Sequence, residues 1–511
     1  MASHDIASEQ NDIKWVIPTL VTVIGGFMSI LDSSIVNVAI STLMNDFHTT
    51  LSRIQWVSTI YMLTLGVIVP TSGWLGDKLG YKKLYIYSLI VFTAGSALCA
   101  IATSENFLII ARIVQALGGG MIMPTMMTMV FSLVPKSKFG QASGLVGVTM
   151  MVAPAVGPTL GGYLVEYVGW RWIFTINIPV GIVAVFLAFL ILPEIPSHRE
   201  AGKFDILGFI SSSAGLFCLL LALTQGQDWG WTSLPIVLLL WVSFGLMGIF
   251  VYHELTTSNP LLDLRIFKIT VFSMGNVLMA VMNIVMFSAL FYVPFFLQVI
   301  RGMGALQVGI LMLPPALVSA VMMPISGLLF DRIGPKVPVT IGTIVTTVAV
   351  YLFSHIDVTT PLRTIVIWNC LRQAGMSLSM MPIQSAAMTA LPPEMVSRGS
   401  AINNIISRVA ASFGLAILTL FVTDRIDMHS AYISWNVSGQ ALNQLLAQGI
   451  AGQQNIGKLL GGLIYQISFV KAINEMFLLS AMLSLTLILP SLWFKKAQTQ
   501  SRSVPGGSTS E

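Results

Sequence analysis

Long apolar runs and short polar links alternate along the whole chain. Apolar runs of about 18 residues or more predict transmembrane helices, because a helix of that length crosses the hydrocarbon core. The runs lack the alternation of period two that a membrane-spanning β-barrel needs. The pattern therefore predicts an all-α integral membrane protein with fourteen transmembrane helices, at about residues 15–41, 52–75, 82–103, 107–131, 139–162, 170–192, 205–225, 233–252, 269–297, 305–329, 336–355, 362–385, 397–422 and 471–494.

The basic residues of the links predict how the chain is oriented. An even number of helices places both termini on one side, which carries 16 of the 26 Lys and Arg residues, against seven on the other side. Since Lys and Arg concentrate in cytoplasmic links, we expect both termini in the cytoplasm. The formal charge of +5 then reflects topology rather than nucleic-acid binding. The first run is too long for a cleavable signal peptide and lacks a cleavage site.

The composition argues against a soluble protein and against an enzyme. With 55% hydrophobic and only 9% charged residues, the chain would not dissolve as a globular domain. Cys99, Cys218 and Cys370 stand singly in apolar runs without metal-ligand spacing, so we expect no metal site. No nucleophile–base arrangement is recognisable, and no cofactor is expected. The chain also has no Walker A sequence, so ATP hydrolysis is not the expected energy source.

Three motifs occur twice, in the same order and at nearly constant spacing. The segment GWLGDKLGYKK at 73–83 recurs as GLLFDRIGPK at 327–336, an offset of 254 residues. A segment that includes Gln115 recurs 258 residues later, and one that includes Gly140 recurs 259 residues later. Repeats of this kind are typical of secondary transporters. The expected organisation is a cytoplasmic N-terminus (1–14), an N-terminal six-helix bundle (15–192), two inserted linker helices (205–252), a C-terminal six-helix bundle (269–494) with an external loop (423–470), and a disordered cytoplasmic tail (495–511).

Five motifs, in order, resemble those of the major facilitator superfamily, specifically its fourteen-helix drug:proton antiporters of the EmrB/QacA type. The resemblance covers the chain from about residue 15 to residue 494. One motif departs from the family pattern, because Ala116 stands where the family usually has Gly. The motifs are the first-helix motif LDSSIVNVAI (31–40), motif A (73–83), motif B RIVQALGGG (112–120), the antiporter motif C APAVGPTLGG (153–162) and WRWIFTINIP (170–179).

Charged residues inside the apolar runs are the candidates for proton coupling. Apart from Asp205, which is the first residue of its predicted helix, Asp32 and Glu475 are the only acidic residues within the predicted helices. A carboxylate in hydrocarbon is costly, roughly 2.5–3.5 kcal/mol on insertion scales, so it usually faces a cavity or a partner. Arg112, at a depth similar to that of Asp32, is implied in proton transfer by the resemblance to motif B. Structural pairing remains the alternative for Asp32 and Arg112, and an interfacial position for Glu475.

Two further arginines, Arg372 and Arg408, also lie inside predicted helices. Their partners do not follow from the sequence. One hypothesis is that Arg408 neutralises Glu475.

The repeated Gly/Asp turn predicts a gate at the cytoplasmic face. Its glycines allow a tight turn and close helix approach, and its aspartates can accept hydrogen bonds from the start of a neighbouring helix. The basic residues can bind anionic headgroups or hold the closed face together. Positive-inside topology alone would explain the basic residues but not the repeated Asp and Gly. The candidate gating residues are Gly73, Asp77, Gly80, Lys82, Lys83, Asp331 and Arg332.

Motif C predicts a tightly packed, distorted helix. Ala153, Gly157 and Gly161 recur every four residues on one helix face, where small side chains let another helix approach. Pro154 and Pro158 distort the backbone. Such a helix at the domain interface could block leakage, although general helix packing is the alternative. The candidate antiporter-motif residues are Pro154, Gly157, Pro158, Gly161 and Gly162.

The substrate cavity is predicted only weakly. Aromatic residues and 28 methionines suit a site for bulky lipophilic ligands, but lipid-facing helices have the same residues. The candidates are Asn37, Gln115, Asn283, Phe287, Tyr292, Asn403 and Asn404.

The resemblance implies a proton-coupled exporter of lipophilic, cationic drugs that works by alternating access in a bacterial cell membrane and contributes to antibiotic resistance. We expect it to work as a monomer, with protons and small-molecule drugs as its ligands. Some relatives in double-membrane hosts need an adaptor protein, and the sequence leaves this open. The alternatives are a dedicated exporter of one metabolite or peptide, and a membrane receptor that transports nothing.

Overall fold

The computed structural model describes residues 15–135, 138–195, 203–437 and 453–492. Within these ranges the chain forms helices and no strands, as the apolar pattern predicts. We call the end of the bundle at which α2 starts and α20 ends the terminus side. This is the side that the distribution of basic residues predicts to be cytoplasmic.

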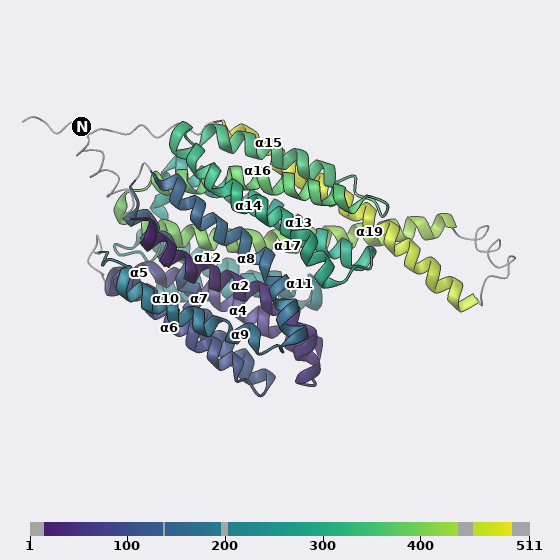
Figure 1. Cartoon of the computed structure of the whole chain (residues 1–511), viewed down its shortest axis with the longest axis horizontal. Helices are drawn as coiled ribbons and strands as arrows, with labels where there is room; N and C mark the ends of the chain where they lie inside the picture. The colour runs from purple at the N-terminus through teal and green to yellow at the C-terminus, as the bar shows by residue number, and fades with distance from the viewer. Residues whose placement is uncertain (1–14, 136–137, 196–202, 438–452, 493–511) are drawn as a thin grey trace, which may run out of the picture.

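The N-terminal half is purple to blue in Figure 1, and its helices run lengthwise along the molecule. Gly25 and Gly118 permit close packing within it, since a Cβ at either glycine would lie less than 3 Å from atoms of α6. Its helices are α2 (Val16–Asp46), α3 (Leu51–Ile54), α4 (Trp56–Ile68), η1 (Val69–Thr71), α5 (Ser72–Leu79), α6 (Tyr81–Ala100), α7 (Glu105–Leu133), α8 (Phe139–Tyr167), α9 (Trp172–Thr175) and α10 (Asn177–Ile191).

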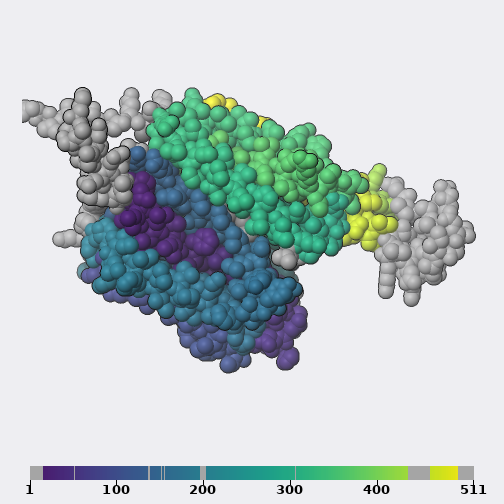
Figure 2. All heavy atoms as spheres, in the orientation of Figure 1, coloured from purple at the N-terminus to yellow at the C-terminus, as the bar shows by residue number. Residues whose placement is uncertain are grey.

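The C-terminal half, green to yellow, lies beside the first (Figures 1 and 2). The long helices α8 and α14 pack against each other across the boundary between the halves. The helices of this half are η3 (Leu264–Lys268), α13 (Thr270–Phe295), η4 (Phe296–Ile300), α14 (Ala305–Ile333), α15 (Lys336–Phe353), α16 (Leu362–Thr389), η5 (Pro393–Met395), α17 (Val396–Val437), α19 (Gln453–Thr486) and α20 (Ile488–Ser491).

Two helices, α11 (Ile206–Trp229) and α12 (Leu234–Thr256), connect the halves in sequence. Helix α11 packs against α4 of the N-terminal half and α17 of the C-terminal half. Ser213 on α11 donates a hydrogen bond to the carbonyl oxygen of Val67 at 2.9 Å. The inserted pair is therefore fixed to the bundle at the junction of the two halves.

The expected count of fourteen spans is not confirmed. Among the described residues, 12 helices are long and apolar enough to cross a membrane, or up to 13 if the bent helix α8 counts as one span. Helix α16 is absent from this set although it occupies the predicted range. The reason is its polar content, which includes Asn369, Arg372, Gln373 and Gln384 and lowers its hydropathy.

The predicted external loop at 423–470 is largely helical instead. Helix α17 continues to Val437 and α19 already begins at Gln453, while residues 438–452 lie outside the described part. Figure 1 shows both helices extending past the end of the bundle, away from the terminus side. The prediction failed because polar residues on an exposed helix resemble those of a loop.

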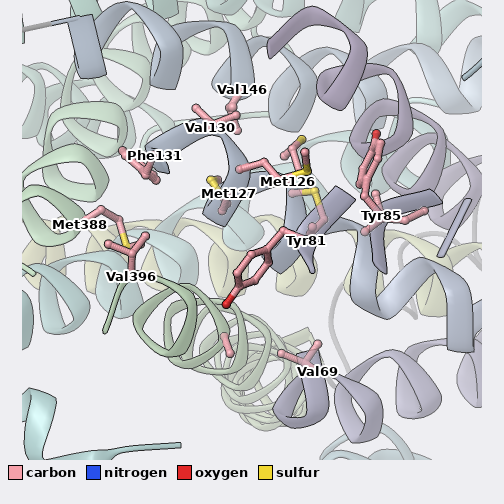
Figure 3. Packing of buried hydrophobic residues seen from close by; sticks show 14 of the residues in the cluster. Val69, Tyr81, Tyr85, Met126, Met127, Val130, Phe131, Val146, Met388 and Val396 are labelled. Atoms are coloured by element: carbon pink, nitrogen blue, oxygen red, sulfur yellow. The ribbon is translucent and has the colours of Figure 1, made fainter. Parts of the chain in front are cut away.

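On the terminus side, one apolar cluster spans both halves (Figure 3). Met127 and Phe131 of α7 belong to the same buried cluster as Met388 of α16 and Val396 of α17. Nearby, Ser400 of α17 donates to the carbonyl oxygen of Pro124 on α7 at 3.1 Å. The halves are therefore packed together at this end.

Candidate functional site

A carboxylate and a guanidinium group meet inside the N-terminal half. Asp32 of α2 and Arg112 of α7 have side chains that are 0% and 1% exposed. Nη1 of Arg112 donates to Oδ2 of Asp32 at 2.5 Å, and the two residues are 80 positions apart in the chain. Packing of α2 beside α7 brings them together. About one turn before Asp32, Ser29 donates to the carbonyl oxygen of Gly119 on α7 at 3.4 Å.

Two amides complete the hydrogen bonding of the carboxylate. Gln115 and Asn177 donate to Oδ1 of Asp32 at 2.8 and 2.9 Å. Gln115 also accepts from Arg112 at 2.6 Å and donates to Ser96 on α6 at 2.7 Å. We call these five residues (Asp32, Ser96, Arg112, Gln115 and Asn177) the Asp32 cluster. The buried carboxylate of Asp32 is thus paired with one cation and accepts hydrogen bonds from two neutral amides.

Aromatic rings and a carbonyl oxygen hold the guanidinium group of Arg112. Its Cζ lies 3.8 Å from the ring centroid of Tyr61 and 5.7 Å from that of Phe174. Its Nε donates to the carbonyl oxygen of Val57 at 3.2 Å. A cation over an aromatic face stays favourable when a neighbouring carboxylate loses its charge. Asp32 could therefore take up a proton without leaving Arg112 unsupported.

Glu475 lies in the other half, at the base of the hairpin formed by α17 and α19. Its carboxylate is 3.2 Å from Nε of Arg425 and 2.9 Å from Nε2 of His429, and its side chain is 38% exposed. The hypothesis that Arg408 neutralises Glu475 is wrong, because the ion-pair partner of Glu475 is Arg425, and His429 contacts the same carboxylate. This geometry matches the interfacial alternative more closely than a second proton site.

The first Gly/Asp turn joins α5 to α6 on the terminus side. Helix α5 ends at Gly80, whose φ of 83° lies in the left-handed region that glycine adopts without strain. The hydroxyl of Tyr81 donates to Oδ1 of Asp77 at 2.8 Å. A Cβ at Gly73 would lie 3.4 Å from Oγ of Ser397, at the start of α17. The turn thus borders the C-terminal half, where a gate is expected.

The second Gly/Asp turn makes a direct contact between the halves. It ends α14 at Gly334, again with a φ of 83°. Asp331 accepts hydrogen bonds from the backbone N–H groups of Gly140 and Gln141, in the first turn of α8, at 2.8 and 3.1 Å. A Cβ on Gly140 would lie 2.0 Å from the carbonyl oxygen of Gly327, so glycine is required for this approach. We call this contact the Asp331 clasp.

The basic residues of the two turns lie against an aromatic ring or at the surface. Nζ of Lys82 lies 5.8 Å from the ring centroid of Phe189, while Lys83 and Arg332 are exposed. Their positions fit both topology and headgroup binding.

The motif C glycines differ in their surroundings. A Cβ at Gly157 would lie 1.9 Å from Oγ of Ser34, and one at Gly161 would lie 2.7 Å from Cγ1 of Ile35, both on α2. A Cβ at Gly162 would have nothing within 4 Å. The first two glycines therefore permit close packing of α8 on α2, and Gly162 does not contribute to it.

The prolines of motif C lie within α8, where the helix bends by 40° between Pro154 and Val156. Pro158 follows one turn later. Each proline removes a backbone hydrogen bond, which explains the bend.

The predicted cavity residues are not assembled into one site. Gln115 lies in the Asp32 cluster, whereas Asn37 is exposed and accepts from Ser58 at 3.0 Å. Tyr292 donates to Thr419 within the C-terminal half at 3.2 Å. The others lie on α13 and α17 of that half: Asn283, Phe287, Asn403 and Asn404.

Sequence reasoning missed two polar residues. Asn177 belongs to the quoted segment WRWIFTINIP, and its position in an apolar run was the available signal. Glu254, at the end of α12, is 0% exposed, and its carboxylate accepts from the backbone N–H groups of Leu261 and Leu262 at 3.2 Å. It was missed because it lies just past the predicted span.

Known proteins resemble the chain over most of its length. It is 36% identical to the uncharacterized MFS-type transporter YhcA of Bacillus subtilis over 417 residues, which cover 81% of this chain and 78% of the relative. It is 30% identical to the lincomycin resistance protein LmrB of Listeria monocytogenes over 473 residues, which cover 93% and 95% of the two chains.

Solved structures show the same fold. The proton:xylose symporter XylE matches with a TM-score of 0.57 and 14% identity, covering 94% of this chain and 96% of that one. The human transporter MFSD10 matches with a TM-score of 0.61 and 12% identity, covering 93% and 99%. The family model described as Major Facilitator Superfamily matches residues 22–415. The resemblance read from the motifs is thus confirmed, and the chain belongs to the Major Facilitator Superfamily.

Proposed function

We propose that the chain is a proton-coupled exporter of lipophilic toxic compounds, in which Asp32 carries the proton. The observation that carries the proposal is the buried pair of Asp32 and Arg112, which Gln115 bridges and to which Asn177 adds a hydrogen bond on Asp32. A carboxylate that is fully buried in the membrane interior is usually functional. The names of relatives support the choice of substrate, since they include a lincomycin resistance protein and a tetracenomycin C resistance and export protein.

The proton would act through the contacts of Asp32. Protonation removes the negative charge to which Arg112, Gln115 and Asn177 donate, and these contacts hold α2 to α7 and α10. Arg112 would then keep its contacts with Gln115, Val57 and Tyr61. A movement of α2 would also move α8, because Gly157 and Gly161 of α8 pack directly on α2.

The Asp331 clasp would be one of the contacts that break when the terminus side opens. It joins the end of α14 to the start of α8, so rocking of the halves must separate its hydrogen bonds. The first Gly/Asp turn, with Gly73, Asp77 and Gly80, would likewise separate from α17 when the terminus side opens. We further propose that the protein works as a monomer in a bacterial cytoplasmic membrane, with both termini in the cytoplasm.

Proteoliposomes with an acidic lumen would test the proposal. Addition of lincomycin or tetracenomycin C to the wild type should alkalinise the lumen, as a trapped pH dye reports, and Asp32→Asn should abolish the response. Glu475→Gln, which changes a carboxylate outside the Asp32 cluster, serves as the matched control and should respond like the wild type. A response that survives in Asp32→Asn and disappears in Glu475→Gln would refute the assignment of the proton site.

A further inference from the structure

Two arginines of the C-terminal half are held in the membrane interior without a carboxylate. Arg372 of α16 is 3% exposed. Its guanidinium group donates to Oδ1 of Asn369 at 2.9 and 3.1 Å and to Sδ of Met376 at 3.1 Å. Both acceptors are neutral and belong to the same helix. In the part of the chain that the structure describes, the ion pairs include neither Arg372 nor Arg408.

Arg408 lies on α17. Its Nε is buried and has no hydrogen-bond acceptor among the described residues. The next residue, Val409, packs against the cluster of Leu63 on α4 and Leu220 on α11, and α17 also packs on α7. Arg408 is therefore positioned at the boundary between the two halves.

Both arginines lie near the middle of the membrane. At about 1.5 Å per residue, Arg372 is roughly 15 Å from the start of α16, and Arg408 is roughly 18 Å from the start of α17 at the other side of a core about 30 Å thick. Lipid headgroups do not reach this depth. Substrate sites of transporters built from repeats lie at this level, between the halves.

Among the described residues, the charges of the membrane interior do not balance. Asp32 is compensated by Arg112, and Glu475 by Arg425. Arg372 and Arg408 therefore leave an excess of positive charge, which repels a cation and attracts an anion. An arginine fork also matches the planar geometry of a carboxylate.

We propose that Arg372 and Arg408 bind an anionic group, such as a carboxylate or sulfonate, on the exported compound. That the compound is exported rests on the proposed function, whereas its binding to the two arginines does not. This assignment of charge differs from the cationic substrates that the sequence resemblance implied. An anion brought by the substrate would supply the partner that each guanidinium group lacks.

Equilibrium binding of two dyes of similar shape and opposite charge would test the proposal. Fluorescein is an anionic xanthene and rhodamine 123 a cationic one. The wild type would be held in nanodiscs of neutral phosphatidylcholine, and fluorescence anisotropy would be compared with that in empty discs. Because no pH gradient is present, the result is independent of proton coupling. We expect fluorescein to bind about tenfold or more tightly than rhodamine 123.

Variants would locate the site. Arg372→Gln and Arg408→Gln should each weaken fluorescein binding about tenfold or more, whereas the lysine variants should retain most of it. Arg363→Gln is the matched control, since it removes a positive charge from an exposed position on α16. Tighter or equal binding of rhodamine 123, no binding of fluorescein, or glutamine variants that behave like Arg363→Gln would overturn the proposal. If a glutamine variant does not fold, the preference of the wild type for fluorescein or for rhodamine 123 decides whether the proposal stands.

Discussion

Replacement of Gly140 by alanine should open the terminus side. The added Cβ would lie 2.0 Å from the carbonyl oxygen of Gly327, whereas ordinary contact begins at 3.4 Å, so α8 and α14 must separate by about 1.4 Å. The same movement would break the hydrogen bond of 2.8 Å between the backbone N–H of Gly140 and Asp331. Overpacking costs about 1–3 kcal/mol, and a lost hydrogen bond to a charged group about 1.5–3 kcal/mol.

Near the lower ends of these ranges, the two terms together destabilise the closed terminus side by about 3 kcal/mol, which changes the ratio of closed to open molecules about a hundredfold. Spin labels on Lys83→Cys and Arg332→Cys, two exposed positions on opposite halves, would report the change by electron–electron dipolar spectroscopy in a background without the native cysteines. We expect a longer distance to appear in Gly140→Ala. Gly162→Ala on the same helix is the control, because its Cβ would meet nothing within 4 Å. Identical distance distributions for Gly140→Ala and the wild type would refute the steric argument.

Three further predictions concern buried polar contacts. Arg112→Ala should lower the free energy of unfolding by about 3–5 kcal/mol, since it leaves a buried carboxylate without its cation. The double variant Asp32→Asn with Arg112→Gln should lose less, and thermal unfolding would compare the two. Asn177→Ala removes one of three donors to Asp32, so drug-driven proton flux should fall about tenfold at equal protein content; unchanged flux would contradict a role for the amide. Glu254→Ala leaves two buried backbone N–H groups of the linker without an acceptor, which should destabilise the protein by about 2–4 kcal/mol. Its folded fraction should transport normally, and a transport defect at normal thermal stability would contradict this structural role.

Some features of the site could be predicted from the sequence because each depends on the type of a single residue and its place in an apolar run or turn. Asp32 and Arg112 stand out as charges in apolar runs, and the cost of burying a charge predicts that each needs a partner. The repeated glycines and aspartates of the turns likewise predicted close approach and helix-start contacts, and Asp331 makes such a contact. The long apolar runs also predicted the positions of the helices, since they report which segments prefer hydrocarbon.

Which of these residues contact each other was decided by the tertiary structure alone. The pairing of Asp32 with Arg112 spans 80 residues and that of Asp331 with Gly140 spans 191. Such pairs depend on the rotation and axial shift of packed helices, which hydropathy does not encode because it gives the same value for every rotation of a helix about its axis. For the same reason the sequence suggested Arg408 as the partner of Glu475, whereas the packing of α17 on α19 supplies Arg425 and His429 and leaves Arg408 at the boundary between the halves.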